Sequence, residues 1–381
     1  TERIYIDGIQ LERGEANDYV IDYNLGEVTF TANRLVNKDI RIQIEFEYSE
    51  QNFLRSITTG NSQYKQGPWE YGLQFFRDTD HKNQPILNEY GGAEKLMLSD
   101  VGDNIDRAII SAADSLGFVS DQIRYKLVDT FCSGCNGFTD DVYVYSNHPD
   151  SAHYQVSFSL VGDNKGDYIV QQELAGGRIY KWVDRLNNIP QGNYTPHIQL
   201  VAAEKKELYT ANASRKIGEK GLFGIELARS NNDINTFSDS MDNDNVGYAS
   251  LVTYQYESDS IGFAGQNWKV DNLISYELNT EEYKQLERFR PVEFTRNWNI
   301  QDVNNELHLI GNRWKASNQL TQLNYGIDYM NFQGQVNGVN QLYTVDQTIK
   351  NVQFVLEGTY LKKVGLENNT FNRPGMLINW T

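Results

Sequence analysis

The sequence lacks the long apolar runs, the basic clusters and the nucleotide-binding motifs that mark several large classes of protein. No stretch of about 18 apolar residues is present, so no membrane-spanning helix is predicted. Its 34 basic residues are outnumbered by 51 acidic ones, giving a formal charge of −17. The basic residues form no dense cluster of the kind that binds a phosphate backbone, so no nucleic-acid partner is expected. Neither a P-loop nor a G-x-S-x-G motif occurs, and no small-molecule substrate is indicated.

Cysteine is almost absent, since the chain has two, Cys132 and Cys135, in the segment FCSGCNGF. A structural zinc site needs four ligands, and a thioredoxin-type pair opens a helix, whereas this segment continues as the strand-like TDDVYVYS. Both of these site types are therefore disfavoured. A disulfide formed in an oxidising compartment and a pair of free thiols remain open, and we prefer the disulfide.

Tyrosine and alternating patterns are abundant instead. The 24 tyrosines favour strands. Near the N-terminus, Asp7-Gly8 separates RIYI from IQLE, and this dipeptide suits a hairpin turn whose two central residues need positive φ. A second turn lies between DYVID and EVTFT, where Asp22, Asn24 and Gly26 supply turn chemistry. Residues 39–50 alternate with period two. Residues 1–58 are therefore predicted to form a small antiparallel β module.

The middle of the chain, residues 59–206, is expected to be a sandwich-like β domain with a helical insert. Residues 85–117 have helical spacing, and Gly91, Gly92 and Gly102 are expected to cut them into short helices. From about residue 122, short alternating segments return, with the turn sequences GDNKG, AGG and PQGN between them. Strands at such even spacing are typical of an all-β body.

Residues 207–381 are predicted to form a long antiparallel meander, which makes the whole fold mainly β. Its strands are each roughly 9–13 residues long, above the usual strand of about 5–6 and similar to outer-membrane barrel strands. A lipid-facing row should be almost wholly apolar, yet neither row of NELHLIGNRWKAS is. The sequence therefore favours a wide soluble or rim-located sheet, and part of an integral outer-membrane β-barrel is the alternative.

No group of residues predicts an active site, so the chain is expected to be no enzyme and to need no cofactor. The metal candidate that we retain is a calcium site formed by Asp233, Asp239, Asp242 and Asp244. Counted from Asp242, however, the twelfth position of an EF-hand loop is Thr253 and not glutamate. A solvated connection between strands is the preferred interpretation.

Residues 287–298, ERFRPVEFTRNW, alternate arginines with glutamates around a proline. The pattern indicates either an ion-pair ladder that docks a partner or the charged face of a strand or its connection, with the proline at an edge or bend. The sequence leaves both interpretations open.

Several stretches resemble one family. IYIDGIQLERGEANDYVIDYNLGEVTFTANRLVNKDIRIQIEFEY looks like a module of very large exported proteins of Bacteroidota, and the giant barrel of the type IX secretion translocon carries related modules. DHKNQPIL (80–87), DSAHYQVSFSLVGDNKGDY (150–168), NNDINTFSD (231–239) and RFRPVEF (288–294) extend the resemblance to large β-rich proteins associated with that translocon, including the plug at its periplasmic mouth. The resemblance implies a non-enzymatic component that occupies or gates a large secretion channel. It also implies a large outer-membrane β-barrel translocon protein as partner, and a periplasmic or outer-membrane location.

Two further expectations concern export. All four Asp-Ser dipeptides precede an apolar residue, which resembles the O-glycosylation sequon of exported Bacteroidota proteins, with Ser115, Ser151, Ser240 and Ser260 as acceptors. The chain opens and closes on strands and has no signal peptide, so we expect a segment of a longer exported protein. The rival function is a surface or periplasmic adhesin-like module that binds glycans or proteins through aromatic sheet faces.

Overall fold

The computed structural model describes residues 2–23, 25–38, 40–46, 52–87, 89–120, 122–135, 137–174, 177–263, 265–300, 306–333, 336–365 and 368–380. The chain is mainly β, with 62% strand and 6% helix, as the sequence predicts. It divides into two compact units. One comprises Thr1–Gln84, Glu204–Asp233 and Met241–Thr381, and the other comprises Pro85–Ala203 and Ile234–Ser240. No described helix is long and apolar enough to cross a membrane.

The first unit begins with a small antiparallel module. Strands β1 (Glu2–Ile6), β2 (Ile9–Gln10) and β5 (Ile42–Phe46) form one sheet, and β3 (Tyr19–Asp22) pairs with β4 (Glu27–Phe30) in another. Asp7 and Gly8 have φ values of 48° and 85°, so the predicted hairpin turn between β1 and β2 is confirmed. Ile4, Leu11 and Tyr19 form the buried core. Of the second predicted turn, Asn24 lies outside the described residues.

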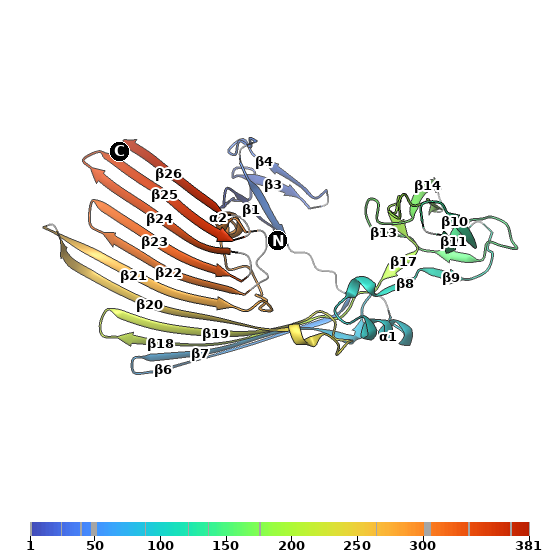
Figure 1. Cartoon of the computed structure of the whole chain (residues 1–381), viewed down its shortest axis with the longest axis horizontal. Coiled ribbons are helices and arrows are strands. Elements are labelled where there is room, and N and C mark those ends of the chain that lie inside the picture. The colour runs from blue at the N-terminus through green and yellow to red at the C-terminus, as the bar shows by residue number, and fades with distance from the viewer. Residues whose placement is uncertain are drawn as a thin grey trace. The chain divides into compact units, whose positions relative to one another are not determined.

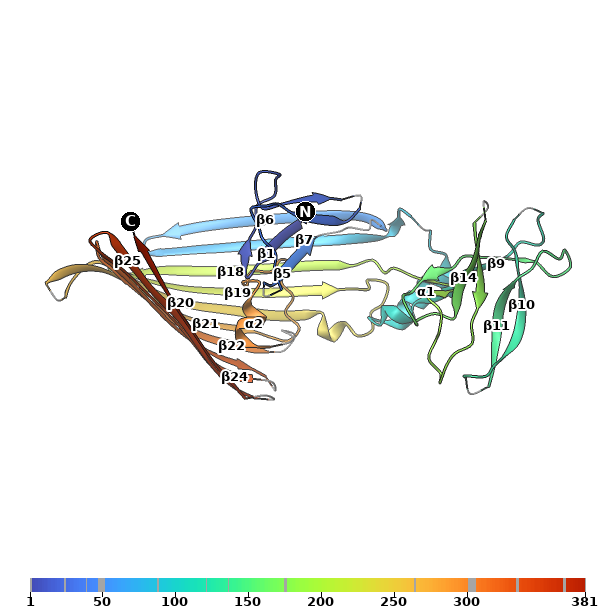
Figure 2. The same cartoon turned by 90° about the horizontal axis from the view of Figure 1, so that it is seen from above.

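Eleven antiparallel strands form the main sheet of the first unit, which is twisted and curved (Figures 1 and 2). Except for β7 and β18, neighbours in the sheet are also neighbours in sequence. The strands, in sheet order, are β26 (Asn369–Trp380), β25 (Val352–Gly365), β24 (Val336–Ile349), β23 (Thr321–Phe332), β22 (Leu307–Ser317), β21 (Gln266–Asn279), β20 (Val246–Phe263), β19 (Gly221–Asp233), β18 (Lys205–Ile217), β7 (Trp69–Pro85) and β6 (Phe53–Gln66).

The sheet is larger than the predicted meander of residues 207–381. Strands β6 and β7, which fall at the end of the predicted N-terminal module and the start of the predicted middle domain, extend it by two strands. β7 pairs with β18 from Trp69↔Arg215 to Thr79↔Lys205. The middle body begins at Pro85 and not near residue 59, while its end at Ala203 lies close to the expected boundary near residue 206.

The second unit contains the helical insert and, among the described residues, three small sheets. Helix α1 (Gly92–Val101) begins at the predicted glycine pair and ends at Gly102, whose φ of 59° terminates it. A 3₁₀ turn, η1 (Ile105–Arg107), and the paired strands β8 (Ile109–Ser111) and β17 (His197–Gln199) follow it. Asn235, fully buried, donates to the carbonyl oxygens of Leu98 and Gly102 at 2.7 and 2.6 Å. It thereby satisfies carbonyls that the end of the helix leaves without partners.

Two four-stranded sheets share a tyrosine-rich core in this unit. One sheet has the order β11-β10-β12-β9 and the other β13-β16-β14-β15. Tyr143 donates its backbone N–H to the Tyr168 hydroxyl (2.8 Å), and Tyr180 does so to the Tyr125 hydroxyl (3.0 Å). Burial raises the pKa of Tyr125 to about 12. The strands are β9 (Ala113–Ser115), β10 (Tyr125–Cys132), β11 (Gly137–Tyr145), β12 (Tyr154–Val156), β13 (Ser159–Leu160), β14 (Tyr168–Leu174), β15 (Gly177–Trp182) and β16 (Tyr194–Thr195).

Candidate functional site

The eleven-stranded sheet has two chemically different faces, which follow from its register. Because side chains alternate along each strand, one cross-strand row lies on one face and the adjacent row on the other. The first such row, on what we call the apolar face, is Tyr71, Ala213, Ile225, Val252, Tyr276, Ile310, Tyr329, Val339 and, on β25, Lys362. The row one residue away, on what we call the polar face, is Gly72, Asn212, Glu226, Leu251, Glu277, Leu309, Met330, Gly338 and Lys363.

The apolar face is widely exposed. Ile310 is 47% exposed, Trp314 46% and Met376 73%, and most of the exposed large apolar side chains of the sheet lie on this face. Contiguous apolar surface of more than a few hundred Å² is rare on a soluble monomer and marks contact with a partner or a membrane. The face therefore has the chemistry of a contact surface.

The polar face carries ion pairs in which the aspartate is buried and the arginine side chain is partly exposed. Arg313 makes a two-fold contact with Asp328, at 2.5 and 2.7 Å, and Arg55 pairs with Asp78. A Cβ on Gly326 would lie 2.9 Å from Arg313 Cδ, so this glycine leaves the space that the arginine side chain crosses. Each of the two aspartates is almost fully buried. A buried carboxylate needs a partner of opposite charge, so these two pairs hold both aspartates on the polar face.

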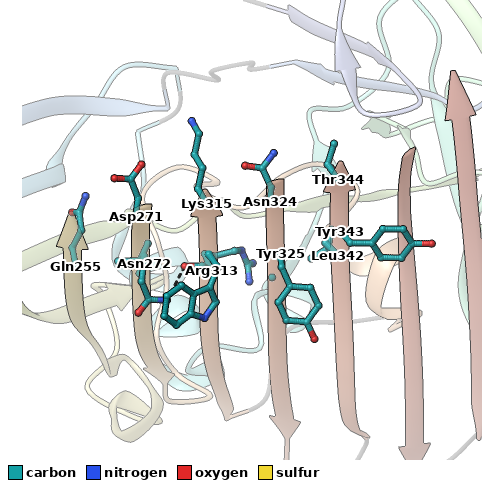
Figure 3. A pocket seen from close by; sticks show the side chains of 13 residues that line it. Gln255, Asp271, Asn272, Arg313, Lys315, Asn324, Tyr325, Leu342, Tyr343 and Thr344 are labelled. Carbon is teal, nitrogen blue, oxygen red and sulfur yellow. Dashed lines mark hydrogen bonds between the residues drawn. The ribbon is translucent and has the colours of Figure 1, made fainter. Parts of the chain in front are cut away.

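A hollow of about 410 Å³ lies beside Arg313 and is lined mostly by polar-face residues (Figure 3). Asp271, Lys315, Asn324 and Thr344 stand side by side on four neighbouring strands, β21 to β24. Because this row alternates an acid, a base and neutral groups, the surface offers hydrogen bonds without a net charge of one sign. It contains no constellation of nucleophile, base and oxyanion donor.

The segment between β21 and β22, residues 280–300, crosses the polar face, and we call it the crossing segment. The Lys284 N–H donates to Ser230 Oγ on β19 at 3.0 Å. Arg290 pairs with Glu277 at 2.5 Å; burial lowers the pKa of this guanidinium, and the glutamate opposes that shift. The short helix α2 (Phe294–Trp298) follows, and Lys363 donates to the Asn299 carbonyl oxygen.

Apolar residues anchor the end of the crossing segment. Trp298 and Ile300 are buried against polar-face positions at one end of β22 to β25, and the cluster is Trp298, Ile300, Leu307, Met330, Phe332, Val336 and Leu361. Gly338 makes room for the indole, because a Cβ there would lie 3.1 Å from it. These contacts explain why the polar-face row of β22 begins with two leucines.

The alternating charges of residues 287–298 bind the N-terminal module of the same chain. Arg288 contacts Glu45 at 2.7 Å and lies over the Tyr5 ring at 5.6 Å, while Arg41 contacts Glu293 at 2.9 Å. Gly8 lies against Glu293, where a Cβ would be 2.8 Å from the glutamate Cγ. The charged residues of this segment therefore hold another part of the same chain, the module formed by β1 to β5.

The cysteine loop lies in the second unit. Cys132 and Cys135 are joined by a disulfide. Asp184 accepts hydrogen bonds from the Ser133 hydroxyl, from the Ser133 N–H at 3.0 Å and from the Gly134 N–H at 3.4 Å. The Ser133 hydroxyl is the largest cause that lowers the pKa of Asp184. The two sulfurs and the Asp184 carboxylate lie close enough to hold a metal, but the sulfurs are bonded to each other and so offer no thiolate.

Comparison with known proteins bears on the module alone. Residues 1–50 match a family described as a domain of unknown function (DUF8818). No curated protein matches the chain. Because the match covers the docked module and not the sheet, it assigns no activity.

The calcium candidate is not assembled. Among the residues that the structure describes, the group able to share a metal contains none of the four aspartates. Asp233 pairs with Lys205 at 3.8 Å, and Asp242 accepts from Asn245 in the 3₁₀ turn η2 (Asp242–Asp244). Asp239 belongs to the other unit. Asp233 and Asp242 each contact another side chain instead of a shared ion, so the described part of the chain offers no assembled site, and calcium binding stays a prediction.

The four candidate glycosylation serines lie at different kinds of position. Three of them are exposed: Ser115 on β9, Ser260 on β20, and Ser240, which precedes β20. Ser151 is half-buried, and its hydroxyl lies 3.2 Å from that of Ser146. Glycosylation at these positions stays a prediction, and the half-buried serine is the least accessible acceptor.

Proposed function

We propose that the eleven-stranded sheet is a section of the wall of an outer-membrane secretion channel, with its apolar face toward lipid and its polar face toward the lumen. The segregation of exposed apolar side chains to one face carries this proposal. A sheet that separates hydrocarbon from water needs this alternation along every strand. The function requires no catalytic residue.

The lengths of the strands support it. They run from 11 to 18 residues, and a tilted strand needs about 9–11 residues to cross a bilayer. Tyrosines and tryptophans on the apolar face suit the two interfaces, because their rings are apolar and their polar atoms remain hydrated.

The crossing segment and the N-terminal module supply the gate of the proposed channel. Side chains fill the interior of a closed barrel of about eight strands, and wider barrels leave water-filled space. Eleven strands therefore belong to a wall with an open lumen. The crossing segment lies on the lumen face and holds the module through Arg288 and Arg41. A docked module narrows the passage, and an undocked module opens it.

The proposed wall is completed by strands from elsewhere. Within the described part of the chain, β6 and β26 each pair on one side, so both edges present free backbone groups. The partner inferred from the resemblance, a large outer-membrane barrel protein of the secretion translocon, is the proposed source of those strands. The proposed cargo, exported protein, rests on the same resemblance.

A plug seated in the channel of another protein remains the second candidate. The docked module supports this candidate too, because a plug and a gated wall both place a module in the lumen. A plug surrounded by water has no use for the exposed apolar face, whereas a wall needs it, and we therefore prefer the wall.

Adjacent positions on β20 test the proposal. In a chain with Cys132→Ser and Cys135→Ser, Val252→Cys reports on the apolar face and Thr253→Cys on the polar face. Each is labelled with an environment-sensitive fluorophore in outer-membrane vesicles. We expect a spin-labelled lipid to quench the label at position 252 and aqueous iodide to quench the label at position 253. Iodide quenching of both labels, with no effect of the lipid quencher, would reject the wall.

A further inference from the structure

A second hollow, of about 590 Å³, opens on the apolar face over β6, β7, β18 and β19. Its floor is made by small residues, Gly60 and Ala211, and its sides by Leu73, Phe75 and Leu227. Leu227 is 51% exposed, so the hollow is open to whatever covers this face. The apolar part of its lining, which includes Leu73, Ala211 and Leu227, suits an alkyl chain.

One charged residue lies at the edge of this hollow. Arg229 falls in the cross-strand row that contains Phe75, Tyr209 and Tyr248, at the end of the apolar stretch of β19. The next row of the same face on one side contains Leu227 and Ala211. The next row on the other side contains Glu207 and Asn231. The arginine therefore stands where apolar surface gives way to polar surface.

Arg229 differs from the neighbouring charges in its lack of an acidic partner. Arg77 pairs with Glu207 at 3.4 Å, and Asn231 donates to the same carboxylate at 2.9 Å. Among the described residues no ion pair involves Arg229. A half-buried guanidinium beside apolar surface, flanked by two tyrosines, is a donor for an anion that arrives together with an apolar tail.

We infer that this hollow binds an anionic glycerophospholipid, with one acyl chain over Ala211 and the headgroup phosphate at Arg229. The inference rests on the proposed function, since it needs the apolar face in contact with lipid. The positive charge of Arg229 favours an anionic headgroup, and the continuity of the hollow with the apolar face favours an acyl chain. The tyrosine hydroxyls of the row supply further donors to the headgroup oxygens.

The binding test uses the full chain purified in neutral detergent. It is equilibrated with equal amounts of dioleoyl phosphatidylglycerol and dioleoyl phosphatidylcholine, and the bound lipids are counted by native mass spectrometry. We expect the protein to retain phosphatidylglycerol over phosphatidylcholine by about five- to tenfold, the effect of one charge-assisted contact at an interface. Arg229→Gln should bring this ratio close to one. Ala211→Phe, which fills the floor, should lower retention of both lipids.

The matched control is Arg215→Gln. Arg215 lies on the same face of the neighbouring strand but stacks on Trp69 at 5.1 Å, so its loss should leave the lipid ratio unchanged. Equal retention by Arg229→Gln and the unsubstituted protein, or an equal loss in Arg215→Gln, overturns the inference. Displacement of the lipid by inorganic phosphate at millimolar concentration also overturns it, because the site then binds a free anion. Failure here with intact lipid quenching at position 252 rejects the lipid site and leaves the proposed wall standing.

Discussion

Neutralising the two closest ion pairs between the N-terminal module and the crossing segment should release the module. The perturbation is Glu45→Gln together with Arg41→Gln, which leaves the crossing segment itself unchanged. Glu45 contacts Arg288 through both carboxylate oxygens, at 2.7 and 2.8 Å, and Arg41 contacts Glu293 at 2.9 Å.

The size of the effect follows from exposure. The side chains of Arg288 and Glu45 are 28% and 31% exposed, and that of Arg41 is 43% exposed, so solvent screens each pair. Exposed pairs contribute about 0.2–1 kcal/mol and charged hydrogen bonds up to about 3 kcal/mol. About 1 kcal/mol for each pair gives a total near 2 kcal/mol, which corresponds to about a 30-fold change in the ratio of docked to undocked module.

Hydrogen exchange measures that ratio directly. The backbone N–H of Phe294 donates to the Pro291 carbonyl oxygen inside the crossing segment, beneath the module. Its exchange should accelerate by up to about 30-fold in the double variant, and less in 1 M salt, where the pairs are already screened. In planar bilayers the same variant should conduct more often at low salt.

The matched control is Glu27→Gln with Lys38→Gln. Both residues are exposed in the same module, and no ion pair is recorded for either among the described residues. Exchange in Glu45→Gln/Arg41→Gln no faster than in this control would refute the reasoning that the ladder holds the module.

Three further predictions concern other parts of the structure. Val252→Arg should lower the free energy of unfolding in lipid vesicles by about 2–4 kcal/mol, whereas Thr253→Arg on the polar face should change it by far less, as measured by urea titration. Gly8→Val should destabilise the module by about 1–3 kcal/mol, because its φ is 85° and its Cβ would meet Glu293, and a lower melting temperature reports it. The pKa of Asp184 is lower in the folded state than in the unfolded chain. Its hydrogen bonds therefore stabilise the fold fully at a pH above the pKa of the unfolded chain, and this stabilisation is lost as the pH falls through the pKa of the folded state. Asp184→Asn should abolish that part of the pH dependence of thermal unfolding.

Local signals predicted the local structure well. The Asp7-Gly8 dipeptide fixed a hairpin because its two positive φ values suit few other residues. Gly92 and Gly102 marked the ends of α1 for a related reason, since Gly102 takes a left-handed φ. The mainly β class followed from alternation alone.

The division of the sheet into two faces was harder to predict because it depends on contacts distant in sequence. Considered alone, β22 has no clean apolar row, since Leu307 and Leu309 share a row with Arg313 and Lys315. The register shows that these leucines lie under the crossing segment and belong to the polar face. Single strands could not reveal this, because the cover comes from Trp298, which the sequence did not place.

The buried cap at Asn235 was missed for the same reason. Its segment, NNDINTFSD, looks like a solvated connection, and its acidic neighbours suggested calcium. The partners of Asn235 are the carbonyl oxygens of Leu98 and Gly102, more than one hundred residues earlier. A lone asparagine between Ile234 and Thr236 carries no signal for such a distant acceptor.

The pairing of β7 with β18 has a consequence for the order of folding. Every other pair of neighbours in the main sheet consists of strands that follow each other in the sequence, and several of these pairs are joined by turns of two or three residues. Pro85 at the end of β7 and Lys205 at the start of β18 are instead separated by a loop of roughly 120 residues. Closing that loop costs about 3–4 kcal/mol more than closing a two-residue turn, at about 0.6 kcal/mol for each doubling of length. The nine strands from β18 to β26 can assemble by successive hairpins without that cost. We therefore expect the β6–β7 hairpin to join last, after folding of the second unit has shortened the effective loop, and we expect folding of that unit to set the rate at which the edge of the sheet is completed.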